Sequence, residues 1–282
     1  MLWHIKDRTF DFSARGGVVM GILNCTRDSF SDGGQFFDPE AAVDHALRME
    51  AEGAEIIDIG GESTRPGSDP VPEAEELRRV IPVIERLAGK LKAAISVDTT
   101  KAAVARAALA AGAAIINDIT ALRGDPEMGP LAAETGAGVI LMHMQGTPGT
   151  MQAAPRYTDV VAEVRDFLRQ SAAHALRSGI DPLRIVLDPG PGFGKTVEHN
   201  VMLLRHVRDL CPPELPGRPI VWAVSRKRFM GELIDDMALE QRFWPTVALT
   251  SLGRELGAVV FRVHDVKANV EALRMTEAIL NS

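Results

Sequence analysis

The sequence alternates eight times between a short apolar run and a longer segment with helical spacing, and this alternation constrains the fold more than any other feature. Such short runs cannot form helices of ordinary length, and they are typical of strands buried on both faces. Strands that alternate with helices predict a parallel sheet with helical crossovers. The expected strands are residues 18–23, Ile56–Ile59, Ala93–Val97, Ala114–Ile116, Val139–Met142, Ile185–Leu187, Ile220–Val224 and Val259–Val263.

The helical segments have recognisable ends. Asp38 is a capping residue followed by Pro39 at the first helical position, and the alanine-rich segment 101–111 stops at Gly112. The length of 282 residues matches the ~250 residues of a (β/α)8 TIM barrel. A doubly wound open sheet is the competing architecture, but its glycine-rich turn after the first strand is missing. We therefore expect one α/β domain over residues 1–282, with residues 1–17 as a lead-in.

Composition narrows the class of function. The formal net charge is −7 and no dense Lys/Arg block occurs, so a nucleic-acid partner is not favoured. No run of ~18 uncharged apolar residues could span a membrane, and the N-terminus lacks the apolar core of a signal peptide. The two cysteines, Cys25 and Cys211, form neither a disulfide framework nor a metal motif. These features favour a cytoplasmic protein.

Every expected strand has a polar residue at or just after its C-terminal end. Barrel enzymes place their active sites at the C-terminal ends of the strands. Polar groups at all eight ends are hard to explain as helix caps, so we expect a pocket there. The strand-end residues are Asn24, Asp58, Asp98, Asn117, Asp118, His143, Asp188, Ser225, Arg226, Lys227, Arg262, His264 and Asp265.

Three of these residues suit a flat heterocycle. Asp98, Asn117 and Asp188 offer carboxylates and an amide that make in-plane hydrogen bonds. A planar amino-pyrimidine edge needs such acceptors for its amino group and ring N–H donors. The alternative for Asp98 is a cap for the helix that begins near Lys101.

A second group suits an anion with a hard cation. Arg262 and His264 are donors, and Asn24 is an oxygen ligand, which together suit a diphosphate with Mg²⁺. Lys227 stands between the two groups, with a solvated loop lysine as the alternative. Gly192 and its neighbouring glycines would let the backbone approach a flat ligand, or they would simply form a turn.

The motifs that carry these residues resemble the dihydropteroate synthase family of folate biosynthesis. From Met20 onward they read MGILNCTRDSFSDGG, DIGGESTRPG, SVDT, NDI, LMHMQG, DPGPGFGK, SRK and RVHDV. The resemblance implies a (β/α)8 barrel that joins a dihydropterin methyl diphosphate to 4-aminobenzoate and releases diphosphate. It also implies a homodimer.

The resemblance assigns roles position by position. Pterin contacts would come from Asp98, Asn117, Asp188 and Lys227, with Met142 against the pterin face and Gly192 in the adjoining turn. Diphosphate and Mg²⁺ contacts would come from Asn24, Arg262 and His264, with Thr64 and Arg65 on the diphosphate. Pro66 and Phe193 would wall the aminobenzoate, and Ser29 and Phe30 would close over it.

The sequence also departs from the family pattern. Arg27 replaces a proline of the first loop, and Pro191 stands in the glycine-rich turn where a larger apolar residue is usual. These changes keep a non-catalytic pterin-binding paralogue open. A pterin-binding methyltransferase is a second alternative, although it has no diphosphate for the first two loops to hold. A sulfonamide-insensitive synthase is the third.

Overall fold

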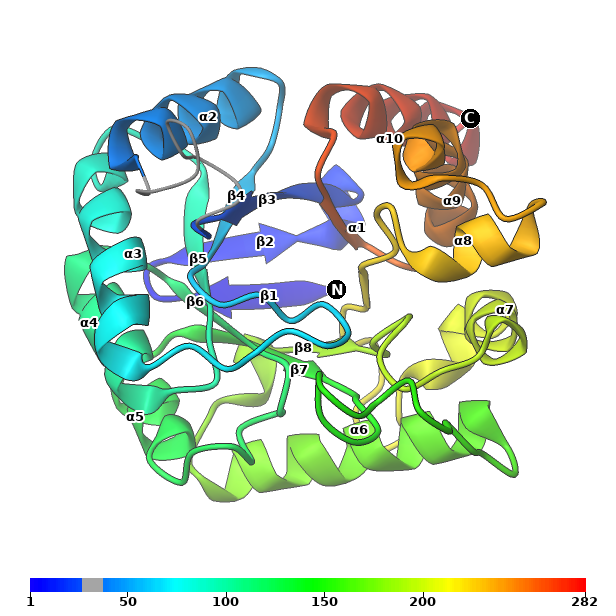
Figure 1. The fold of residues 1–282 in the computed structure, drawn as a ribbon, viewed down its shortest axis with the longest axis horizontal. Coiled ribbons are helices and arrows are strands. Elements are labelled where there is room, and N and C mark those ends of the chain that lie inside the picture. The colour runs from blue at the N-terminus through cyan, green and yellow to red at the C-terminus, as the bar shows by residue number, and fades with distance from the viewer. Residues whose placement is uncertain (27–37) are drawn as a thin grey trace.

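The computed structural model, which describes residues 1–26 and 38–282, is a closed barrel of eight parallel strands (Figure 1). The strand order is β8-β7-β6-β5-β4-β3-β10-β9, and a parallel bridge between Leu187 and Ile220 joins β8 to the segment that leads into β9. The predicted fold is therefore confirmed. The strands are β3 (Val18–Asn24), β4 (Ile56–Gly60), β5 (Ala94–Asp98), β6 (Ile115–Asp118), β7 (Gly138–Met142), β8 (Ile185–Asp188), β9 (Val221–Trp222) and β10 (Val260–Val263).

Helices surround the strands on the outside (Figure 1). Several begin where the sequence places a cap: Asp38 accepts from the amide of Glu40, and Thr196 forms a capping box with His199. The six-residue α8 was not predicted, and its N-cap residue, Lys227, makes no capping hydrogen bond through its side chain. The α-helices are α2 (Pro39–Ala51), α3 (Glu73–Leu87), α4 (Ala102–Ala111), α5 (Met128–Thr135), α6 (Val160–Arg177), α7 (Val197–Arg205), α8 (Arg228–Leu233), α9 (Phe243–Glu255) and α10 (Val266–Leu280). Short 3-10 turns are η1 (Pro182–Arg184), η2 (Val207–Leu210) and η3 (Leu239–Arg242).

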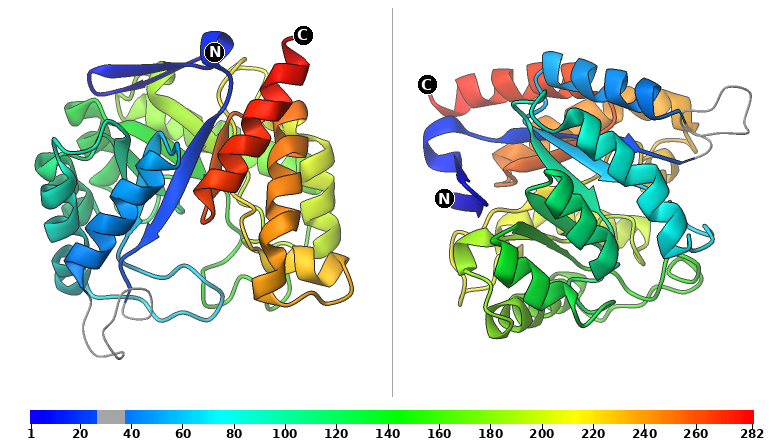
Figure 2. Two further views of the ribbon diagram at one scale, coloured as in Figure 1. Left: turned by 90° about the horizontal axis from the view of Figure 1, so that it is seen from above. Right: turned by 90° about the vertical axis from the view of Figure 1, so that its left-hand side faces the viewer.

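The first residues are more than a lead-in. They form an antiparallel hairpin, β1 (Leu2–Ile5) and β2 (Arg8–Asp11), followed by α1 (Phe12–Arg15). Trp3 and Phe10 are fully buried, and Trp3 donates from Nε1 to the carbonyl oxygen of Arg184 at 3.0 Å. The hairpin lies at one end of the barrel, opposite the loop after β4 (Figure 2). It therefore plugs the N-terminal end and leaves the other end as the mouth.

The barrel interior changes from apolar to polar along the strands. Near the hairpin it is filled by Met20, Ile56, Ala94, Ile115, Ile140, Val186 and Val260, which pack with Trp3 and Phe10. Side chains two or four positions further along the same strands point the same way, because the strand period is two. These positions include Asp58, Asp98, Asn117, Asp188 and Arg262. The polar site thus lies above a sealed apolar floor.

The described residues contain no helix that could cross a membrane.

Candidate active site

Strand register brings the predicted polar residues to one level of the barrel. Asn24 pairs with Gly60, Gly60 with Asp98, and Asp98 with Asn117 across three adjacent parallel ladders. The ring continues on β7 and β8, where Met142 pairs with Asp188. Residues that the sequence spreads over most of the chain therefore share one strand-end ring.

Arg262 forms the central contact of this ring. Its Nε donates to Asp58 Oδ2 at 2.7 Å, and its Nη2 donates to Asp98 Oδ2 at 2.7 Å. Asn117 Nδ2 donates to the same Asp58 oxygen at 3.0 Å. The sequence assigned Arg262 and Asp98 to separate clusters, whereas the structure joins them through one guanidinium. The two expected clusters are therefore parts of a single network.

Asp98 is not a helix cap. Lys101 occupies the cap position of α4 without a side-chain cap, and the amide of Ala102 instead donates to Asp125 Oδ2 at 2.9 Å. Burial raises the pKa of Asp98 to about 7, and the adjacent Arg262 charge opposes this effect. Its carboxylate is held in the barrel mouth, where it can accept hydrogen bonds from a ligand.

Asp188 is the second buried carboxylate of the site. Its Oδ1 accepts from the amide of Gly190 at 2.7 Å, which turns the chain directly after β8. Burial raises the pKa of Asp188 to about 6, while the backbone hydrogen bond and the charges of Lys227 and Arg262 oppose the rise. Two carboxylates with raised pKa values in one mouth are typical of a functional site.

Lys227 is not a solvated loop lysine. Its Nζ lies 4.0 Å from the centroid of the Phe193 ring, a cation–π contact. Burial lowers the pKa of Lys227 to about 8, with a further contribution from the Arg262 charge. Phe193 packs in turn with Met142, Ile119 and Met151 in a small apolar cluster. The predicted pterin-face and aminobenzoate-wall residues therefore share this cluster under Lys227.

The turn that carries Phe193 explains Pro191. The amide of Phe193 donates to Gly190 O at 3.1 Å, and Gly192 has a φ of 79°. Proline at the second position and a positive φ at the third are the preferences of a type II turn. At Gly190, a Cβ atom would collide with the carbonyl oxygen of His143. Pro191 is thus compatible with an intact turn. Gly190 is required by the close approach of the His143 backbone, and Gly192 by its positive φ.

His264 occupies the other side of the mouth. Ser225 Oγ accepts from the backbone amide of His264 at 3.1 Å and lies 2.9 Å from its Nδ1. Burial lowers the pKa of His264 to about 3, and the positive charges of Arg262, Arg226 and Arg65 contribute. The ring is therefore neutral near pH 7. When the serine hydroxyl donates to Nδ1, the proton of the imidazole lies on Nε2, from which it can donate to an anion.

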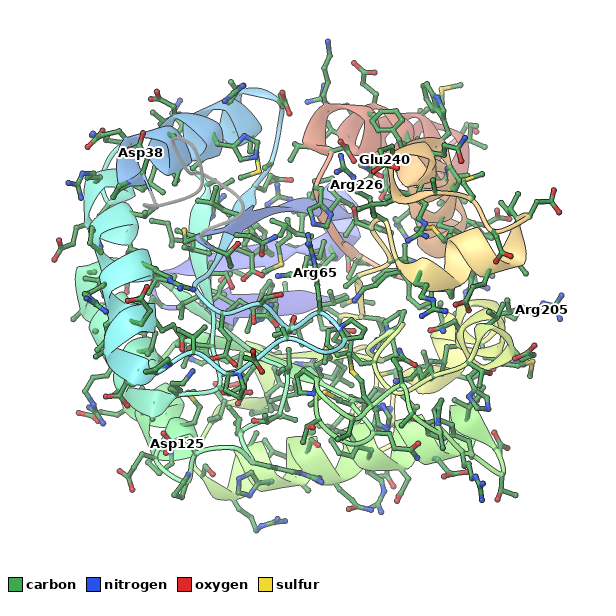
Figure 3. The ribbon with its side chains drawn as sticks, in the orientation of Figure 1. Asp38, Arg65, Asp125, Arg205, Arg226 and Glu240 are labelled. Carbon is green, nitrogen blue, oxygen red and sulfur yellow. The ribbon has the colours of Figure 1, made fainter. Side chains whose placement is uncertain are left out.

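The loop after β4 carries the remaining predicted contacts. Thr64 is half-buried, whereas Arg65 and Pro66 are exposed, and the amide of Gly67 donates to Pro148 O at 3.2 Å. Arg65 lies in front of the barrel centre in the view of Figure 3, and its charge acts on His264. Ser29, Phe30 and Arg27 lie outside the described residues.

Three residues that contact the predicted site residues received no role from the sequence: Asp58, Lys195 and His143. Asp58 stood among the strand-end residues but received no role, and it is fully buried against Arg262. Lys195 and His143 also received none, although both lie within quoted motifs. Lys195 Nζ lies 2.8 Å from His143 Nδ1 and is buried. The lysine that ends the DPGPGFGK motif was the signal that could have identified Lys195.

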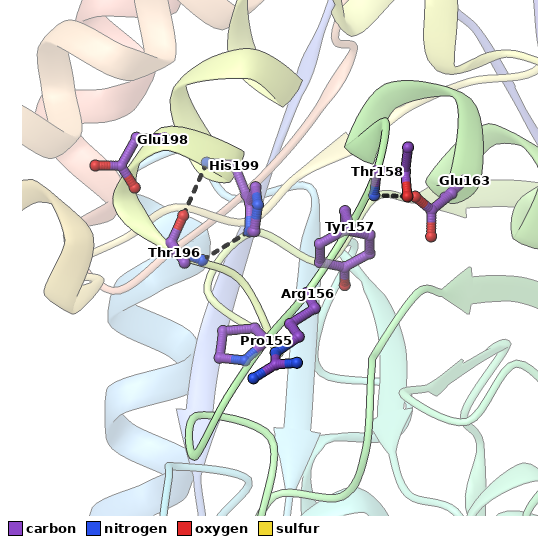
Figure 4. A pocket seen from close by; sticks show the side chains of 8 residues that line it. All are labelled: Pro155, Arg156, Tyr157, Thr158, Glu163, Thr196, Glu198 and His199. Atoms are coloured by element: carbon purple, nitrogen blue, oxygen red, sulfur yellow. Dashed lines mark hydrogen bonds between the residues drawn. The ribbon is translucent and has the colours of Figure 1, made fainter.

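A groove of about 710 Å³ opens beside the turn, outside the ring of strand ends (Figure 4). The phenol of Tyr157 forms part of its wall and donates to Gly194 O at 2.8 Å. The groove is lined by Pro155, Arg156, Tyr157, Thr158, Glu163, Thr196, Glu198 and His199. None of these is a strand-end residue, so the groove is separate from the predicted site.

Comparisons with known proteins agree with this geometry. The pterin binding enzyme family matches residues 20–264. Dihydropteroate synthase of Mycobacterium leprae is 46% identical over 270 residues, covering 94% of each chain. A structure of the Xanthomonas albilineans synthase with 4-aminobenzoic acid is 50% identical, with a TM-score of 0.87 and 94% of each chain covered. The Burkholderia cenocepacia synthase complexed with 7,8-dihydropteroate is 42% identical, with a TM-score of 0.90, covering 99% of this chain and 96% of that one.

Proposed function

The chain belongs to the dihydropteroate synthase family of pterin-binding enzymes, and from this premise we propose which of its residues carry the reaction. The enzyme is a transferase that condenses 6-hydroxymethyl-7,8-dihydropterin diphosphate with 4-aminobenzoate, giving 7,8-dihydropteroate and diphosphate. The observation that carries the assignment is the Asp58–Arg262–Asp98 network, because it places hydrogen-bond acceptors and a forked cation in one mouth.

The pterin binds to the acceptor side of the mouth. Asp98, Asn117 and Asp188 accept from its amino group and ring N–H donors, and Met142 packs against its face. Charged acceptors in a closed site orient a flat ring strongly, since an unpaired buried donor costs ~1–3 kcal/mol. Lys227, whose Nζ lies over the Phe193 ring, donates a hydrogen bond to the pterin.

The diphosphate binds to the donor side. Arg262, Arg65 and the Nε2–H of His264 donate to its oxygens, with Thr64 as a hydroxyl donor. The residues also fit a Mg²⁺ ion that is bound together with the diphosphate. Asn24 supplies one oxygen ligand, and in the described chain no group of three His, Cys, Asp or Glu side chains could hold a metal alone. Mg²⁺ typically takes one or two protein oxygens together with substrate phosphates, and it would supply charge neutralisation there.

The chemistry needs no protein nucleophile. The C–O bond to the diphosphate breaks and its electron pair leaves with the diphosphate, whose charge the Arg262, Arg65 and His264 donors stabilise. The remaining cation is delocalised into the pterin. The lone pair of the neutral arylamine forms the new C–N bond, and one amine proton is then released. Gly192, Phe193 and Pro66 wall the aminobenzoate, and Ser29 and Phe30 are assigned to the same substrate by the family motif.

The assembly is a homodimer in the cytoplasm. Apolar side chains on α9 and α10 support the dimer: Trp244 is 71% exposed, Met275 64% and Ile279 63%. Large exposed apolar groups on neighbouring helices are typical of a protein–protein surface. The whole chain from residue 1 to 282 forms one pterin-binding barrel domain.

The pterin assignment is tested by calorimetry with a pterin analogue. We expect Asp98→Ala to weaken binding by ~1–3 kcal/mol or more, because it leaves ligand donors unpaired. Asp125→Ala is the matched control, since Asp125 accepts from the first amide of α4 and lies at the edge of the molecule, away from the barrel centre (Figure 3). The control should lower stability and leave pterin affinity unchanged. Equal affinities for the wild type and Asp98→Ala would reject the assignment.

A further inference from the structure

Lys195 has an environment that the reaction described above does not use. The residue is 3% exposed, and its Nζ lies 2.9 Å from Gly190 O, 3.0 Å from Phe193 O and 2.8 Å from His143 Nδ1. None of its hydrogen-bond partners in the described chain is a carboxylate. A buried lysine is costly, so it persists only where its hydrogen bonds are satisfied.

These three contacts are satisfied whatever the charge of Lys195. As an ammonium, the group donates to both carbonyls and to the lone pair on His143 Nδ1. As a neutral amine, it donates to both carbonyls and accepts from an Nδ1–H of His143. The hydrogen bonds that link the turn after β8 to the end of β7 therefore do not depend on the charge of Lys195.

The two carbonyls belong to opposite ends of the type II turn. Gly190 O is also the acceptor for the Phe193 amide, so Lys195 spans the turn from its first residue to its last. Other side chains hold different atoms nearby: Asn200 Oδ1 accepts from the amide of Gly192 at 2.7 Å, and Tyr157 donates to Gly194 O. Among the described residues, Lys195 is the side chain that holds the Phe193 carbonyl.

We propose that Lys195 is a positioning residue for the aminobenzoate wall: by tying Gly190 O and Phe193 O to His143, it fixes the Phe193 ring beneath Lys227. The proposal rests on the proposed function of this mouth. Phe193 reaches its neighbours only if the turn keeps its shape, because its ring is held between Lys227 and the apolar cluster of Met142, Ile119 and Met151. Loss of the clamp would displace the wall, while the pterin acceptors Asp98, Asn117 and Asp188 stay in place on β5, β6 and β8.

The test compares Lys195→Met with Tyr157→Phe in a steady-state synthase assay. For Lys195→Met we expect KM for 4-aminobenzoate to rise at least tenfold. The dissociation constant for a pterin analogue should stay within threefold of wild type. Tyr157→Phe removes a hydrogen bond to the neighbouring carbonyl of Gly194 and should change neither value more than twofold. An unchanged KM in folded Lys195→Met, or equal losses in both constants, would overturn the proposal.

Two further controls keep the result decisive. If the wild-type protein itself forms no dihydropteroate in the same assay, the proposed function is rejected, independently of the Lys195 variants. If Lys195→Met does not fold, Lys195→Gln replaces it. Its shorter amide can reach only one carbonyl, so an intermediate rise in KM is expected. An unchanged KM in Lys195→Gln, or failure of both variants to fold, would assign Lys195 a purely structural role and overturn the proposal.

Discussion

Replacing Arg262 with lysine tests the central network most severely. Arg262 makes two hydrogen bonds of 2.7 Å to two different carboxylates, and one of these, Asp58, is fully buried. A lysine keeps the positive charge but has a single ammonium, which cannot reproduce the two directions of the guanidinium fork. One carboxylate therefore loses its charged partner.

The expected cost follows from that loss. A hydrogen bond to a charged group contributes ~1.5–3 kcal/mol, whereas removing the partner of a buried ion pair altogether costs ~3–5 kcal/mol. Since lysine retains one contact, we expect the free energy of unfolding to fall by about 1.5–3 kcal/mol at pH 8. A similar loss in the transition state corresponds to a decrease of about ten- to a hundredfold in turnover.

Urea unfolding and synthase turnover measure the two effects. Arg86→Lys is the matched control, because Arg86 pairs with Glu40 at the surface at 2.7 Å and such pairs contribute ~0.2–1 kcal/mol. At pH 5 the penalty of Arg262→Lys should shrink, since Asp98, with a pKa of about 7, is then protonated even in the wild type. A penalty no larger than that of Arg86→Lys, or one that is equal at pH 5 and pH 8, would refute this reasoning.

Two further predictions follow from the same structure. Affinity for a neutral pterin analogue should fall as the pH drops from 8 to 5. The pKa values of Asp98 and Asp188 are raised to about 7 and about 6, so both acceptors become protonated in this range. An affinity that calorimetry finds independent of pH would contradict this prediction. Trp3→Ala should lower the free energy of unfolding by ~3–5 kcal/mol, since Trp3 is fully buried at the barrel floor, while KM values in folded protein stay unchanged; an unaltered urea midpoint would show that the hairpin does not seal the barrel.

Much of the fold could be predicted because each barrel strand carries a short, mostly apolar run that is buried in the structure. The cap Asp38 and Pro39 correctly predicted the start of α2, and Gly112 correctly predicted the end of α4. The N-terminal hairpin was missed because Leu2–Ile5 and Arg8–Asp11 are short and of mixed polarity. Its stability depends on Trp3 and Phe10 meeting the barrel interior, a long-range contact that local patterns do not contain.

The candidate site was also predictable only in part. The strand-end rule located Asp98, Asn117, Asp188 and Arg262, because parallel strands in a barrel end at one rim. It could not predict that Arg262 turns toward Asp58 and Asp98, which are 204 and 164 residues away in sequence. Side-chain direction across a ring depends on register and on competition among neighbouring charges. Lys195 was overlooked for a similar reason, since its partners are two backbone carbonyls and His143, which the sequence places 52 residues away.

The most direct test of the account measures both products of one reaction. Purified protein is given the dihydropterin diphosphate, 4-aminobenzoate and Mg²⁺, and dihydropteroate and diphosphate are quantified together. We expect equal amounts of the two products, no product without 4-aminobenzoate, and a large loss of turnover in Arg262→Lys but not in Arg86→Lys. Binding of a pterin analogue without any dihydropteroate formation would contradict it and identify a non-catalytic pterin-binding protein.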